Sequence, residues 1–338
     1  MIRRIALLAT ACILLIGLSL SGCGPVGDAV VTFPDPNLDT AIREALNKPS
    51  GPIYASELAG LASLGAYEKG IHDLWGLQYC TNLEGLGLAF NGMSDISPLA
   101  DLTNLRALDL QFNAISDISA LANLTNLTYL DLWRNRVGDV SPLSNLTSLT
   151  DLNLSVNLIS NISALANLTN LTDLRLEDNQ ISDISPLANL TNLTDLRLED
   201  NQISDISPLA SLTNLTDLDL EINQISDISP LANLTSLTYL DLKDNGTSDI
   251  SPIANLTNLT YINLWHNQVG DISPLANLTS LTYLDLRDNG ISDISSLVEN
   301  TGLSGGGDSV ELAGNPLSSD SIDVYIPQLM ARGVYVDY

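Results

Sequence analysis

Apolar side chains recur along this chain with a period of 22 residues. Leucines stand at every second position shortly before an asparagine, and the asparagine returns in the same register ten times, at Asn91, Asn113, Asn135, Asn157, Asn179, Asn201, Asn223, Asn245, Asn267 and Asn289. A fixed period of this length indicates a solenoid, in which each repeat buries its apolar face against its neighbours. The repeats therefore predict one continuous body.

Each repeat predicts the same local elements. Its Leu-x-Leu pair alternates between apolar and polar positions, which is typical of a strand with one buried and one exposed face. One strand per repeat gives a parallel sheet. We expect the asparagine side chain to satisfy backbone groups of neighbouring coils. Ser185-Pro186-Leu187 and its equivalents predict a short 3₁₀ turn on the opposite side, with the serine hydroxyl as its cap.

These motifs resemble the leucine-rich repeat, and the phrase Ile-Ser-Asp-Ile-Ser-Pro-Leu-Ala-Asn-Leu-Thr-Asn-Leu resembles the internalin type. Residues 167–188 and 189–210 are identical at all 22 positions, which indicates recent duplication. The resemblance implies an α/β solenoid with a parallel sheet on the concave face, 3₁₀ turns on the convex side, and a cap at each end. Internalins are bacterial surface proteins that bind protein partners through the concave face, so the resemblance implies that binding mode.

The ends of the array depart from the period. The repeats extend over residues 61–300, and the first is degenerate because Lys69 stands in the asparagine position. In this register Cys80 falls in a buried leucine column, where a thiol packs as a small apolar group. Because a terminal coil would otherwise expose its core, we expect a helical cap over residues 32–60, with helices at Asp39–Asn47 and near Ala55–Leu64.

Residues 301–338 are expected to hold an irregular last repeat and the C-terminal cap. Asn315 follows Asn289 by 26 residues, and Gly305-Gly306-Gly307 takes up the extra length. The apolar spacing of Ser321–Arg332 predicts an amphipathic helix, and Val334–Tyr338 predicts a closing strand.

The N-terminal segment is typical of an export signal. A short basic start precedes an apolar run of 16 residues from Ile5 to Leu20, which is short for a membrane span. Leu20-Ser21-Gly22-Cys23 resembles the bacterial lipobox. This predicts a signal peptide over residues 1–22, a lipid on Cys23, a tether over residues 23–31 and an extracytoplasmic location at the bacterial membrane or cell surface. The alternative is an ordinary signal peptide that carries a cysteine.

The net charge of the chain excludes some classes of binding partner. The chain has 40 acidic and 13 basic residues, a formal net charge of -27 and a pI near 4.1. Binding to a polyanion depends on basic residues, so nucleic acid and anionic lipid surfaces are excluded as partners. Cleavage before Cys23 removes Cys12, and lipid occupies Cys23. Only Cys80 then remains free, so no disulfide framework is expected.

The sequence carries no catalytic signature. His72 and His266 are about nine coils apart, which corresponds to roughly 40 Å at the spacing of neighbouring strands. There is no phosphate-binding glycine loop, no metal-spaced His/Cys cluster and no Gly-x-Ser-x-Gly motif. We therefore expect a protein that is not an enzyme and that uses no cofactor.

Specificity is expected from the polar strand positions, which lie six, four and two residues before each asparagine. They change from acidic residues in the central coils to tyrosine and tryptophan on either side. Arg175 and Arg197 stand between acids on their own strands, so the acidic centre either is self-paired or binds a ligand, and the aromatics either bind or only stack. The candidate ligand-binding residues are Tyr129, Trp133, Asp173, Asp195, Asp217, Glu221, Tyr239, Tyr261, Trp265 and Tyr283.

Together these features predict a lipid-anchored, monomeric binding protein whose partner is a protein with a basic patch. Aromatic residues on a preformed surface favour protein contacts, and an acidic field attracts basic partners. Two alternatives remain open: a structural or envelope-assembly component, and a carbohydrate-binding surface protein.

Overall fold

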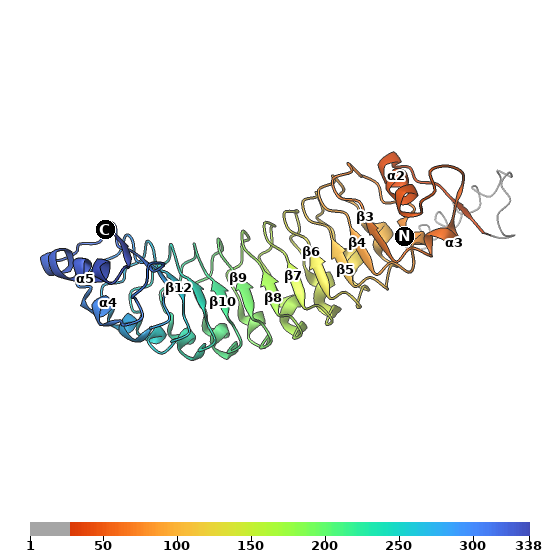
Figure 1. Cartoon of the computed structure of the whole chain (residues 1–338). Helices are drawn as coiled ribbons and strands as arrows, with labels where there is room; N and C mark the ends of the chain where they lie inside the picture. The colour runs from red at the N-terminus through yellow and green to blue at the C-terminus, as the bar shows by residue number, and fades with distance from the viewer. Residues whose placement is uncertain (1–27) are drawn as a thin grey trace.

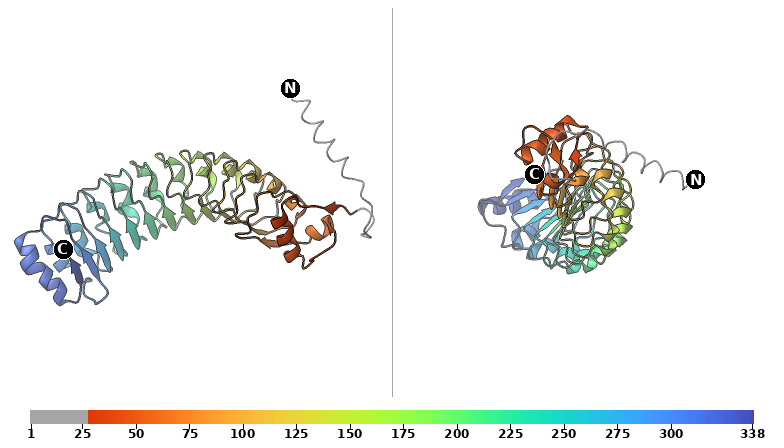
Figure 2. Two further views of the ribbon diagram at one scale, coloured as in Figure 1. Left: turned by 90° about the horizontal axis from the view of Figure 1, so that it is seen from above. Right: turned by 90° about the vertical axis from the view of Figure 1, so that its right-hand side faces the viewer.

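The computed structural model describes residues 28–338, so the predicted signal peptide, Cys23 and the start of the predicted tether lie outside the described residues. The described chain forms a curved solenoid (Figure 1). A 13-stranded parallel sheet lines its inner side, and short helices cover the outer side (Figure 2). Within residues 28–338, no helix is long and apolar enough to cross a membrane.

The strands of this sheet follow one another in sequence order, one per coil. Each strand has three residues, with the central one buried. They are β3 Ser63–Gly65, β4 Gly85–Gly87, β5 Ala107–Asp109, β6 Tyr129–Asp131, β7 Asp151–Asn153, β8 Asp173–Arg175, β9 Asp195–Arg197, β10 Asp217–Asp219, β11 Tyr239–Asp241, β12 Tyr261–Asn263, β13 Tyr283–Asp285, β14 Ser309–Glu311 and β15 Tyr335–Asp337.

The outer side of the coils carries the predicted 3₁₀ turns. They are η1 Leu77–Tyr79, η2 Ser97–Leu99, η3 Ser119–Leu121, η4 Ser141–Asn145, η5 Ser163–Asn167, η6 Ser185–Leu187, η7 Ser207–Ser211, η8 Ser229–Asn233, η9 Ser251–Ile253 and η10 Ser273–Asn277. In the last regular coil a short α-helix replaces the 3₁₀ turn, α4 Ser295–Glu299.

The expected serine cap of these turns is wrong. In η6 the cap position is Ile184, and Ser185 is already the first helical residue, so its hydroxyl does not cap the turn. The backbone N–H of Ser185 instead donates to Oδ1 of Asp183 at 2.8 Å. The aspartate of the Ser-Asp-Ile-Ser phrase therefore supplies the capping oxygen, and its hydrogen bonds to Ser185 lower the pKa of Asp183.

The core is a continuous stack of leucine and isoleucine side chains that runs the length of the array. Leu174, Leu196 and Leu218 are aligned on adjacent strands and are fully buried. Cys80 occupies one of these columns with no exposed surface, as predicted, and burial raises the pKa of its thiol to about 12. Because every coil contributes the same apolar set, the core has no centre and stability is spread along the solenoid.

The repeated asparagines tie successive coils together, as predicted. Nδ2 of Asn201 donates to the carbonyl oxygens of Leu198 and Glu199 in its own coil and of Leu176 in the previous coil, at 3.0 to 3.2 Å. Its Oδ1 accepts the backbone N–H of Ile181 at 2.9 Å. One buried amide thus satisfies four backbone groups at the turn, which would otherwise be costly to bury.

The N-terminal end is closed by a small mixed cap. Helix α2 spans Pro36–Ala45 and begins earlier than predicted, because Asp35 accepts the N–H groups of its first turn. The second helix is much shorter than the predicted one near Ala55–Leu64: α3 ends at Leu58 after starting at Ala55, and the chain then enters β3. Strands β1 Val30–Val31 and β2 Ile53–Tyr54 form a small antiparallel sheet that the sequence did not predict.

The C-terminal end is closed by a helix and a strand. The predicted helix consists of a π-helical turn, η11 Ser321–Tyr325, followed by α5 Ile326–Ala331. The closing strand is β15, which pairs with β14 in parallel and continues the main sheet. The sheet therefore extends past the regular repeats to the end of the chain.

Candidate binding surfaces on the concave face

Three tyrosines form a stacked row on the C-terminal half of the sheet, and we call Tyr239, Tyr261 and Tyr283 the tyrosine ladder. They start β11, β12 and β13 and lie in register. Successive ring centroids are 4.4 and 4.7 Å apart, with interplanar angles of 11° and 8°. The guanidinium of Arg197 lies 5.3 Å from the Tyr239 ring centroid. The inner ring faces are therefore covered, and the ladder presents mainly ring edges and hydroxyls.

The hydroxyls of the ladder stay protonated at neutral pH. Burial and the nearby carboxylates of Asp219 and Asp241 raise the pKa of Tyr239 well above its usual range. Burial, followed by the charge of Asp241, raises the pKa of Tyr261 to about 12. The Tyr239 hydroxyl donates to Asp241 Oδ2 at 3.4 Å. The ladder is thus a rigid, neutral surface with hydrogen-bonding groups.

The middle polar column of the strands differs from the prediction. It was expected to be exposed, but Asp131, Asp219, Asp241, Asn263 and Asp285 are buried. Their side-chain oxygens accept the backbone N–H two residues further along, as between Asp241 Oδ1 and Lys243 N at 2.9 Å. The aspartate or asparagine at the end of each of these strands therefore has a structural role, because its side chain accepts a hydrogen bond from the backbone of the turn that follows.

Arg175 and Arg197 replace that acid in the two duplicated coils and compensate the acidic centre in part. Arg175 pairs with Asp173 at 3.1 Å, and Arg197 pairs with Asp195 at 2.8 Å and with Asp219 at 3.5 Å. Asp173 and Asp195 are therefore paired with arginines of the chain itself. Asp217 binds its neighbour instead, accepting from the Thr216 hydroxyl at 2.7 Å.

The glutamates of the same two coils have fewer partners than the aspartates. Among residues 28–338, neither Glu177 nor Glu199 forms an ion pair, and one carboxylate oxygen of each is buried without a hydrogen-bond partner. Burial, with the charges of Asp219 and Glu177, raises the pKa of Glu199 to about 8. Burial and the Asp200 carboxyl beside it raise the pKa of Asp178. We call Glu177, Asp178, Glu199 and Asp200 the acidic strip.

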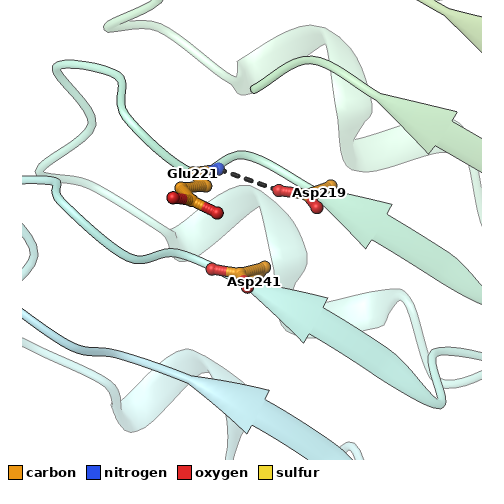
Figure 3. A group of neighbouring side chains, drawn as sticks. All are labelled: Asp219, Glu221 and Asp241. Carbon is orange, nitrogen blue, oxygen red and sulfur yellow. Dashed lines mark hydrogen bonds between the residues drawn. The ribbon is translucent and has the colours of Figure 1, made fainter. Parts of the chain in front are cut away.

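Three carboxylates come together next to this strip. Oxygens of Asp219, Glu221 and Asp241 lie within 4.8 Å of one another (Figure 3). Such a group could hold a cation, but it is already compensated: Glu221 pairs with Lys243, Asp219 pairs with Arg197, and Asp241 Oδ2 accepts from Asn263 at 2.9 Å. Hydrogen bonds and ion pairs from the chain itself thus account for this cluster, and we assign no ion to it.

Trp265 is separate from the tyrosine ladder. Its indole N–H donates to Asp288 Oδ2 at 2.8 Å, and its ring lies between Lys243 at 4.7 Å and Arg287 at 4.3 Å. The sequence placed it in one aromatic zone with the tyrosines, but the column of Asp241 and Asn263 lies between them. The indole is therefore bounded by two cations, whereas the tyrosines of the ladder are bounded mainly by one another.

The N-terminal half carries a second aromatic surface, which the sequence indicated only through Tyr129 and Trp133. Tyr129 is exposed and donates to Asp131 at 3.3 Å. Trp133 joins three rings that were not predicted, and we call Tyr67, Phe90, Phe112 and Trp133 the aromatic patch. Ring centroids are 5.0 Å apart for Tyr67 and Phe90, 4.6 Å for Phe90 and Phe112, and 6.1 Å for Phe112 and Trp133.

The signal for this patch lies one position beyond the strand columns. Phe90 and Phe112 directly precede the asparagines of their coils, and both have a left-handed backbone, with φ of 55° and 53°. Their equivalents in later coils are mostly polar, including Asp178, Asp200 and Asp288. Aligning this turn position with the three strand positions would have placed the two phenylalanines beside Trp133.

The repeats match a known protein family. The model of the family "Leucine Rich repeats (2 copies)" matches residues 81–123, 125–167, 169–211, 191–233, 213–255, 235–277 and 257–299. An internalin of Listeria monocytogenes, InlF, is 39% identical over 90% of this chain and 91% of its own, with a TM-score of 0.84. The chain belongs to the internalin-like leucine-rich repeat proteins. No curated protein matches it.

Two further solved structures are similar to this internalin-like protein. Internalin C2 of Listeria monocytogenes is 44% identical over 65% of this chain and 100% of its own, with a TM-score of 0.61. The plant peptide hormone receptor RGFR1, solved in complex with RGF2, is 26% identical over 71% of this chain and 41% of its own, with a TM-score of 0.63. Internalin-like leucine-rich repeat proteins are generally not enzymes.

Proposed function

We propose that this internalin-like protein is a bacterial surface protein that binds a protein partner through its concave face. The tyrosine ladder carries this proposal. Its rings are fixed by mutual stacking, so a partner gains contact area at little entropic cost. The chain has a formal net charge of -27, and Asp217, close to the ladder, forms no ion pair within residues 28–338. This negative charge favours a partner with a basic patch and speeds its approach.

The stacking geometry also bears on carbohydrate binding. A sugar ring packs on the open face of an aromatic ring, whereas the inner faces of the ladder are occupied by one another and by Arg197. Ring edges and hydroxyls suit protein side chains better than sugar rings. The ladder thus favours a protein partner over a carbohydrate.

Tyr261→Ala combined with Trp265→Ala is expected to shorten the lifetime of the complex. The double variant removes the central ring of the ladder and the indole between Lys243 and Arg287, and losses at such contacts appear mainly in dissociation. Surface plasmon resonance against the partner, identified by pull-down from cell extracts, measures both rates. Raising the salt concentration should mainly slow association of the unmodified protein.

The matched control is Met330→Ala, an exposed apolar residue in the C-terminal cap. It should bind like the unmodified protein. Unchanged dissociation in the tyrosine and tryptophan variant would move the site to the convex face or the caps and refute the concave-face proposal.

We also propose that a lipid on Cys23 holds the protein at the membrane. The predicted tether ends at Val31, so a fully extended segment from Gly24 to Val31 would reach at most about 28 Å. The N-terminal cap would then stay close to the membrane while the concave face extends away from it. The lipobox Leu20-Ser21-Gly22-Cys23 supports this part of the proposal.

Cys23→Ala is expected to release the protein from membranes, because the thiol that accepts the lipid is gone. Fractionation of cells followed by detergent partitioning measures the effect. Cys80→Ala is the control, since Cys80 is buried in the core and should not affect partitioning. A Cys23→Ala protein that still partitions with membranes would refute the lipid anchor while leaving the binding role intact.

A further inference from the structure

One edge of the solenoid combines partly exposed aromatic rings with acidic side chains that form no ion pair within residues 28–338. We call the positions one and two residues before each repeated asparagine, together with Tyr67 and Glu68 of the degenerate first coil, the edge strip. The aromatic patch lies at its N-terminal end, and the acidic strip lies in the two duplicated coils. The edge strip thus changes from apolar to acidic over a few coils.

The aromatic patch is costly for the isolated protein. Tyr67 and Phe112 are 55% and 37% exposed, and contiguous exposed aromatic rings are typical of interaction sites. The left-handed backbone at Phe90 and Phe112 disfavours bulky side chains, whereas the aspartates in later coils suit it well. Each of these phenylalanines therefore has an unfavourable backbone conformation and leaves part of an apolar ring in contact with water. A partner that covers the rings would remove the second of these costs.

The acidic strip supplies the second, complementary feature. Asp178 and Asp200 are exposed, and within the described chain no lysine, arginine or histidine pairs with any of its four carboxylates. The nearest arginines, Arg175 and Arg197, are engaged by Asp173, Asp195 and Asp219. A cation from outside the chain would relieve the repulsion between these stacked acids.

The distance between the aromatic patch and the acidic strip limits which ligand can contact both. Phe112 and Glu177 are three coils apart, about 14 Å at the spacing of neighbouring strands. An extended chain covers that distance in roughly four residues. Arg134 occupies one face of Phe112, with its guanidinium 4.6 Å from the ring, and Phe90 lies against both Tyr67 and Phe112. Apolar groups of a ligand therefore contact chiefly the exposed parts of Tyr67 and Phe112.

We propose that the edge strip binds an extended segment of a protein partner in which apolar side chains are separated from basic ones by about four residues. The apolar side chains lie on the aromatic patch, and the lysines or arginines lie on the acidic strip. This inference rests on the proposed protein-binding role and adds a contact surface outside the tyrosine ladder, together with the chemistry of its ligand.

Two synthetic peptides of identical composition test it with the purified protein. In the first, leucine and isoleucine are separated from three arginines by a Gly-Ser spacer of about four residues. In the second, the same apolar and basic residues alternate. Fluorescence anisotropy of the labelled peptides should show at least about tenfold tighter binding of the spaced peptide, because only it reaches both surfaces at once.

Variants assign that binding to the edge strip. Phe90→Ala with Phe112→Ala should weaken binding of the spaced peptide by about tenfold or more, which is typical of lost aromatic anchors. Asp178→Asn with Asp200→Asn should weaken it and flatten its dependence on salt concentration, because these two carboxylates are the exposed ones of the acidic strip. Met330→Ala is the control and should bind as the unmodified protein does. Thermal unfolding confirms that each variant is folded, and the asparagine pair gives a separate test if the alanine pair does not fold.

Three outcomes would overturn the inference. The first two are equal affinity for both peptides and undiminished affinity in the Phe90 and Phe112 variant. The third is loss of peptide binding in Tyr261→Ala with Tyr283→Ala while the Phe90 and Phe112 variant still binds, which would place the peptide on the tyrosine ladder and support the proposed concave-face site. Peptide binding that needs only the edge strip, with a natural partner insensitive to Tyr261→Ala with Tyr283→Ala, would support the inference and refute the ladder as the site.

Discussion

Replacing Leu196 with alanine is expected to lower the free energy of unfolding by about 2 to 5 kcal/mol. Leu196 is fully buried at the centre of β9, aligned with Leu174 and Leu218 on the adjacent strands. Alanine would leave a cavity that both neighbouring coils line, and a close-packed solenoid core can collapse into it only partly. Chemical denaturation followed by circular dichroism measures the change.

Asp195→Ala is the matched control, because Asp195 precedes Leu196 on the same strand and faces the opposite side. It removes an ion pair with Arg197 whose two side chains are each 27% exposed, and such pairs contribute about 1 kcal/mol or less. Removing one of several stacked acids also relieves repulsion. Equal losses of stability in the two variants would mean that the inner and outer faces of the strand have been exchanged.

Replacing Asn201 with alanine is expected to cost about 3 kcal/mol or more, although the change removes only a small polar group. Its amide serves three carbonyl oxygens and one N–H from two coils, all at a buried turn. Each buried backbone group that loses its partner costs about 1 to 3 kcal/mol, although water entering the turn would recover part of this. The same denaturation experiment measures the loss.

Asn214→Ala provides the comparison. Asn214 is exposed and makes one hydrogen bond to the previous coil, from Nδ2 to the carbonyl oxygen of Thr191 at 2.8 Å. Its loss should cost about 1 kcal/mol or less, since water replaces the missing partner. Similar costs for Asn201 and Asn214 would contradict the role of the repeated asparagine as the buried link between coils.

The regular part of the fold could be predicted because the same pattern of apolar and polar positions recurs in ten coils. The leucine columns, the parallel strands, the 3₁₀ turns and the linking asparagine all follow from spacing alone, and the buried position of Cys80 follows from its register. The caps were predicted less well. The helix expected near Ala55–Leu64 ends at Leu58, because the chain must enter β3 to pair with β4.

The candidate binding surfaces were also predicted only in part. The sequence placed Tyr239, Tyr261 and Tyr283 on adjacent strands, and the structure adds that their rings stack on one another. Period-two alternation also assigned Asp241 and Asp285 to the exposed face. In the structure they are buried, because the curved inner surface brings neighbouring columns over them and the following turn takes their oxygens.

The sequence by itself determined the acidic character of the chain, which follows from composition. It also determined the repeat unit, the direction of its strands and the identity of the core columns, because these depend on contacts between equivalent residues one period apart. Only the tertiary structure decided which aromatic and polar side chains contact one another. Trp265 is enclosed by Lys243 and Arg287, whereas Phe90 and Phe112 meet Trp133 across different columns. Those contacts depend on side-chain direction at the turns, which a one-dimensional period does not contain.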